Sequence, residues 1–260
     1  MKYTLITILI LALLFSCKDK YIPGGIDYFY LPRECKILGA SNAFLKDEGS
    51  FLGLEGLYSI NRITNEENSV KVENYLLDIY TSNVNPEIIE AYMSSPDYKG
   101  ESLIQLIDSV FLDEHDFDME RQMSRYLESK SSLSSSSTAT DGVNLVPLEY
   151  RLSEIKDLKI YSTSSLFGEK AGRPLNRYFQ IYSTSNGFVF DRNKQLIPLK
   201  NKEWSLGKYL SIAPIASVDL FLCFKSAPPE LPIDTRMVVE MELANGEILR
   251  DSSALVRLLK

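Results

Sequence analysis

Residues 237–249 read MVVEMELANGEIL, and this stretch decides the fold class. Apolar residues stand at every second position from Met237 to Leu243, and two of the three positions between them are glutamates. A period of two is typical of a strand with one buried face. The pair Asn245-Gly246 follows, and Asn-Gly is the strongest short hairpin signal because both turn positions need a positive φ. The stretch therefore predicts an antiparallel hairpin near the C-terminus.

The same alternation occurs in several other stretches, at 70–80, 158–161 and 218–224, which we interpret as strands. Turns rich in Gly, Pro and Asn separate them. Several short strands in this arrangement predict a mainly β fold, an antiparallel sandwich of the immunoglobulin-like or a related type, over residues 35–260.

Residues 86–130 have a different character and predict a helical insertion between strands. Asn85 is suited to cap a helix, and Pro86 is tolerated at the first helical position. Apolar residues then recur at helical spacing, and residues 117–127 predict a further, more polar helix. Residues 131–142, which are rich in serine and threonine, lack the apolar groups that would offset their ordering entropy, so we expect a mobile loop there.

The first 16 residues have the order of a secretory signal peptide. Lys2 precedes an apolar run that extends from Thr4 to Phe15, and the small residue Ser16 ends it. About a dozen apolar residues are too few to span a bilayer, which takes about 20. We therefore predict that residues 1–16 are removed on secretion.

The tetrapeptide Leu14-Phe15-Ser16-Cys17 resembles the lipobox of bacterial lipoproteins. The resemblance implies cleavage before Cys17, a lipid on its thiol, and a lipidated N-terminus and tether at 17–34. It also implies a place in the cell envelope, at the outer membrane. Lys18-Asp19-Lys20 resembles the surface-export tag of Bacteroidota lipoproteins, so both the cell surface and the periplasmic face stay open. The alternative is an ordinary secretory signal followed by a chance cysteine.

Two further stretches, 155–162 and 171–176, resemble a family of Bacteroidota lipoproteins of unknown function. In those relatives a strand precedes an Ala-Gly-x-x-Leu-Asn segment, and the chain ends in a hairpin with a glycine turn. The resemblance implies a sandwich-like domain. It implies no activity, because the family has none established.

Three side chains are candidates for specific roles outside the lipid anchor. Cys35 and Cys223 are a candidate disulfide in a compartment that allows such bonds, and the alternative is two buried, unpaired thiols. Trp204 is the one tryptophan, and it is a candidate for stacking on a sugar ring. The alternative is that Trp204 anchors the core.

Charge and motifs argue against several classes of function. The net charge of −7 disfavours nucleic acid and anionic lipid surfaces as partners. His115, the one histidine, lies in the acidic run 113–120, where a metal site is conceivable. That run has no glycine for the turn of a calcium loop, so we interpret it as a solvated junction and expect no metal or cofactor. Neither a Gly-x-Ser-x-Gly elbow, a P-loop, a dinucleotide fingerprint nor HExxH occurs.

These observations predict a lipid-anchored, non-catalytic binding or structural module of the cell envelope. Its partners would be the membrane, through the lipid, and an envelope protein or a glycan. A carboxylate-dependent carbohydrate-active enzyme is one alternative, since that chemistry needs only two acids at a set separation. An adhesin or pilus-type subunit is another, and an open edge strand would favour it.

Overall fold

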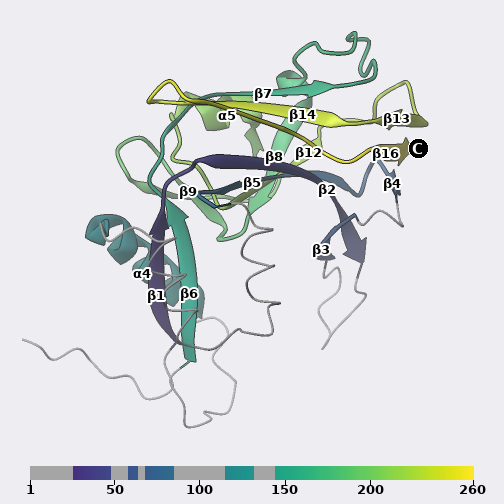
Figure 1. Cartoon of the computed structure of the whole chain (residues 1–260). Coiled ribbons are helices and arrows are strands. Elements are labelled where there is room, and N and C mark those ends of the chain that lie inside the picture. The colour runs from purple at the N-terminus through teal and green to yellow at the C-terminus, as the bar shows by residue number, and fades with distance from the viewer. Residues whose placement is uncertain (1–25, 48–57, 64–67, 85–114, 132–143) are drawn as a thin grey trace, which may run out of the picture.

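The computed structural model describes residues 26–47, 58–63, 68–84, 115–131 and 144–260. Their fold is mainly β, with several antiparallel sheets and a small helical insertion, which confirms the predicted fold class (Figure 1). Four predicted features lie outside the described residues: the signal peptide, the lipidated Cys17, the first helical stretches of the insertion and the serine-rich loop. Those predictions stay predictions.

A six-stranded antiparallel sheet forms one layer of the sandwich, with the strand order β11-β8-β12-β5-β2-β3. Its strands are β11 (Trp204–Ser205), β8 (Phe179–Thr184), β12 (Asp219–Phe224), β5 (Tyr75–Ser82), β2 (Ile37–Asp47) and β3 (Tyr58–Arg62). The interior strand β5 is buried on both faces except at Tyr80. Side chains on both of its faces are therefore held by packing.

The predicted single strand at 70–80 is two strands. β4 (Ser69–Lys71) ends in a turn, closed by the hydrogen bond from Asn74 N to Lys71 O (3.0 Å), and β5 begins at Tyr75. β4 joins a separate sheet of order β13-β16-β4, with β13 (Ile233–Thr235) and β16 (Val256–Leu259). The turn thus moves the chain from one sheet to another.

The second layer is the antiparallel sheet β15-β14-β7, built from β7 (Ile155–Ser162), β14 (Met237–Leu243) and β15 (Ile248–Ser252). β14 and β15 are the hairpin predicted from the sequence, and Gly246 in its turn has a φ of 87°. The inward residues of β14 pack with those of β5 and β2 in one apolar cluster. Figure 1 shows β7 and β14 as a layer over the six-stranded sheet. Each fully buried aliphatic side chain in this cluster contributes about 1.5–3 kcal/mol.

A parallel two-stranded ribbon extends away from the two layers (Figure 1). It pairs β1 (Ile26–Arg33) with β6 (Asn144–Arg151) in register over their full length. The prediction of a tether over 17–34 is therefore wrong for residues 26–33. Tyr28 and Tyr30 of β1 explain why, because both pack against a second apolar cluster instead of remaining in solvent.

The helix α4 (Phe117–Ser131) packs beside the ribbon and confirms the polar helix predicted at 117–127. Met119 and Met123 are buried in the second cluster together with Phe188, which belongs to β9 (Phe188–Phe190). β9 pairs with β10 (Leu196–Pro198), and a short helix α5 (Leu206–Ser211) and a 3-10 turn η1 (Asn176–Tyr178) complete the described elements. No helix in the described ranges is both long and apolar enough to cross a bilayer.

Candidate functional site

Two buried arginines lie where the ribbon meets the six-stranded sheet. Arg33 is the last residue of β1 and Arg151 is the last residue of β6, and the parallel register pairs them directly. Their side chains are 7% and 1% exposed. A buried charge is costly unless it is paired and hydrogen-bonded, so the groups around these arginines decide what the site can do.

Glu149 bridges the two guanidinium groups. Its Oε1 lies 2.9 Å from Nη2 of Arg33, and its Oε2 lies 3.2 Å from Nη1 of Arg151. Burial lowers the pKa of both arginines, and the negative charge of Glu149 opposes that shift. Both groups remain charged, because arginine is not deprotonated in proteins. One carboxylate, itself 31% exposed, thus serves two cations.

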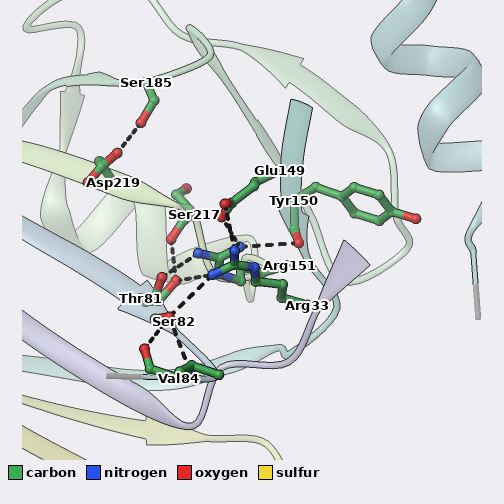
Figure 2. A network of polar contacts seen from close by, with 10 residues as sticks. All are labelled: Arg33, Thr81, Ser82, Val84, Glu149, Tyr150, Arg151, Ser185, Ser217 and Asp219. Atoms are coloured by element: carbon green, nitrogen blue, oxygen red, sulfur yellow. Dashed lines mark hydrogen bonds and ion pairs between the residues drawn. The ribbon is translucent and has the colours of Figure 1, made fainter. Parts of the chain in front are cut away.

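Three other donors of the arginines hold the end of β5 (Figure 2). Arg151 donates from Nε to Thr81 Oγ1 (3.0 Å) and from Nη2 to the Thr81 carbonyl. Arg33 donates from Nη1 to Ser82 Oγ (3.4 Å), and Ser82 Oγ in turn donates to the Val84 carbonyl (2.7 Å). The arrangement attaches the ribbon to the most deeply buried strand of the sandwich.

A small cavity of about 20 Å³ adjoins this network. Arg151 and Glu149 line it together with Ser185, whose hydroxyl donates to Asp219 Oδ2 at 2.6 Å (Figure 2). A volume of this size holds about one water molecule, whereas sites for organic ligands have several hundred Å³. The network can therefore bind water and order the chain, but it has no room for a substrate.

A second polar group lies at the start of α4. Asp116 caps the helix, since its Oδ1 accepts from Met119 N at 3.0 Å, and its Oδ2 lies 2.6 Å from Lys194 Nζ. Partial burial acts to raise the pKa of Asp116, but the hydrogen bonds from Lys194 and Met119 outweigh it and the pKa is lowered. The cap fixes where the helix begins.

One carboxylate oxygen of Glu120 contacts two side chains at this junction. Tyr150 OH donates to Glu120 Oε1 at 2.8 Å, and the same oxygen lies 2.6 Å from His115 Nδ1. Glu120 is only 8% exposed, so the interpretation of the acidic run 113–120 as a wholly solvated junction is wrong at this residue. Among the described residues, no group of three or more His, Cys, Asp or Glu side chains is placed to hold a metal ion.

The structure separates the two candidate disulfide partners. Cys35 lies in the cluster between the sheets, whereas Cys223 lies in a small cluster with Ala43, Leu45 and Leu76, and both thiols are unpaired. Of the two alternatives left open by the sequence, the structure therefore favours two buried, unpaired thiols over the candidate disulfide. Burial raises the pKa of Cys35 to about 11 and also raises that of Cys223, which makes both poor nucleophiles.

Trp204 anchors the core. It is 8% exposed, pairs with Ile181 across β11 and β8, and belongs to the cluster between the sheets. Lys208 Nζ lies 4.4 Å from the centre of its ring and covers one face. Of the two alternatives left open for Trp204, the structure therefore favours the core anchor over stacking on a sugar.

Sequence reasoning missed the arginine network. Arg33 and Arg151 are 151 − 33 = 118 positions apart in the sequence. Only the parallel register brings them together. A local signal exists at Glu149, because a Glu-x-Arg spacing places both side chains on one face of a strand.

Comparison with protein-family models gave no match, and searches of curated proteins and of solved structures gave no significantly similar chain.

Proposed function

We propose that this chain is a lipid-anchored, non-catalytic module of the cell envelope that binds or holds another envelope component. The observation that carries the proposal is the order of the first 17 residues: a charged start, an apolar run, Ser16 and Cys17. A thiol at that position receives the lipid, and several acyl chains, at about 0.8 kcal/mol per buried methylene, hold a folded domain on a membrane.

The position of β1 supports this anchoring. Ile26 begins β1 at the end of the ribbon that points away from the two sheets (Figure 1). Cys17 precedes it by 26 − 17 = 9 positions, which span at most about 30 Å when extended. A lipid on Cys17 would therefore place the free end of the ribbon near the membrane and the β15-β14-β7 sheet farther from it.

The use of the polar side chains supports a non-catalytic role. Glu149 neutralises two arginines, Glu120 accepts from Tyr150, and Asp116 caps α4. Each of these acids is engaged in holding one element to another, in the part of the molecule where the ribbon, α4 and the sandwich meet. The cavity beside the arginines has room for about one water molecule.

The test is metabolic labelling of cells with a clickable fatty acid, followed by mass spectrometry of the purified full-length product. We expect acylation of the wild-type chain and none of Cys17→Ala. Cys35→Ala and Cys223→Ala are matched controls that should keep the label, because those thiols are buried in the fold. Acyl chains on Cys17→Ala, or an unmodified wild-type chain that still starts at Met1, would contradict the proposal.

A further inference from the structure

The outer face of the β15-β14-β7 sheet carries a hollow of about 300 Å³. Strand alternation explains its lining: Ile160 and Val239 point into the core, so Tyr161, Val238 and Glu240 point outward. The volume lies at the lower end of the range for ligand sites, about 300–1,000 Å³. It suits a small ligand or the end of a longer one.

The register fixes how the lining side chains are arranged. Val238 pairs with Tyr161 of β7, so an aromatic ring lies beside an aliphatic side chain on the floor of the hollow. The next outward position of β14 is Glu240, which pairs with Arg250 of β15. An apolar pair on β7 and β14 therefore lies beside a charged row, Lys159, Glu240 and Arg250, that crosses all three strands.

Gly172 forms part of the wall. Its chain segment folds back on the end of β7 through the hydrogen bond from Gly172 N to Ser162 O, at 2.9 Å. Gly172 has a φ of 76°, and the space where a Cβ would stand is open. The backbone of this segment thus borders the hollow without a side chain that would fill it.

Some charged side chains on this face have ion-pair partners, and one arginine among the described residues has none. Lys159 Nζ lies 3.4 Å from Asp157 Oδ2 and 3.6 Å from Glu240 Oε1, so the lysine serves both acids. Arg250 is exposed, and within the described part of the chain its guanidinium group has neither an ion pair nor a hydrogen bond. A guanidinium group offers a planar fork of donors that matches a carboxylate.

From this arrangement we infer that the hollow binds a saccharide that carries a carboxylate, such as a uronic acid. Arg250 binds the carboxylate, Glu240 accepts hydrogen bonds from ring hydroxyls, and the C–H face of the sugar packs on Tyr161 and Val238. Glu240 and the net charge of −7 disfavour polyanions, since repulsion grows with each added negative charge. The inference rests on the proposed function, because it names the partner of the binding module.

The test measures, by calorimetry, binding of the full-length protein in detergent micelles to galactose oligomers that end in a single galacturonic acid (the acidic oligomers), with uncharged galactose oligomers as the comparison. We expect the acidic oligomers to bind more tightly. Arg250→Gln should weaken their binding by about 10- to 100-fold, the loss expected for a hydrogen bond to a charged group. Tyr161→Ala should weaken acidic and neutral oligomers alike.

The matched control is Arg121→Gln, since Arg121 is an exposed arginine on α4, outside this sheet. It should bind as wild type does. Absence of binding by the acylated protein, or binding that Arg250→Gln leaves unchanged, would overturn the assignment while the lipid anchor stands. Equal binding of a short peptide that carries one aspartate would overturn the saccharide class. If the wild-type chain isolated from its cells carries no lipid and still binds, the site stands and only the anchor is contradicted.

Discussion

Replacement of Glu149 by glutamine tests whether the arginine network holds the ribbon on the sandwich. The change keeps the shape of the side chain but removes the negative charge that Arg33 and Arg151 share at 2.9 and 3.2 Å. Two buried guanidinium groups then lie side by side without their counter-charge, which is the costly way to break a buried ion pair.

The magnitude follows from the contacts. A hydrogen bond to a charged group contributes about 1.5–3 kcal/mol, and two are weakened in Glu149→Gln. The glutamine oxygen still accepts one of them, and Glu149 is 31% exposed, so water replaces part of the loss. We expect the free energy of unfolding to fall by about 2–3 kcal/mol, which lowers Tm by roughly 5–10 °C in a domain of this size.

The assay is urea unfolding, together with hydrogen exchange read strand by strand. Exchange should rise in β1 and β6 more than in β14, because the network attaches the ribbon and not the outer sheet. Glu203→Gln is the matched control: its exposed pair with Lys200 should contribute less than about 1 kcal/mol. The reasoning is refuted if Glu149→Gln unfolds within 0.5 kcal/mol of wild type, or if exchange rises equally in all three strands.

Three other perturbations have defined outcomes. Asp116→Ala should destabilise the protein by about 1 kcal/mol through loss of the helix cap. Because the folded pKa of Asp116 is lowered, its contribution is present above the unfolded pKa and is lost as the pH falls through the folded one, and urea titrations between pH 2 and 6 would show this. Cys35 and Cys223 should both resist a thiol reagent at pH 8 until the protein unfolds, and a reductant should leave Tm unchanged; a disulfide found by mass spectrometry would contradict this. Trp204→Ala should cost about 3–5 kcal/mol in denaturant unfolding, and a loss below 1 kcal/mol would exclude a core role.

The sequence predicts the features whose causes are local. The hairpin of β14 and β15 follows from alternation and from Asn245-Gly246, and α4 follows from its helical pattern. The turn after β4 escapes prediction because Val72-Glu73-Asn74 contains neither glycine nor proline. Local propensity cannot reveal that the chain changes sheets there.

For the candidate site residues, the sequence left two alternatives open wherever the outcome depends on the pairing or the face of a strand. Cys223 alternates with Leu222 on β12, and Leu222 faces the cluster that holds Cys35. Cys223 therefore points to the opposite face, as the alternation at 218–224 indicates, but nothing in the sequence reports which of the two faces Cys35 shares. Trp204 stands among polar neighbours and resembles a loop residue, yet pairing with β8 places it in the core.

The pairing of β1 with β6 has a consequence for assembly. The two strands close a loop of more than a hundred residues, and contacts this distant in sequence form late because loop entropy must be overcome first. The ribosome synthesises the N-terminus first. Residues 26–33, which contain two tyrosines, therefore have no partner strand until residues 144–151 have also been synthesised. A chain that ends before residue 144 lacks β6 altogether. In such a chain the unpaired strand near the N-terminus is the segment that proteases and chaperones can recognise.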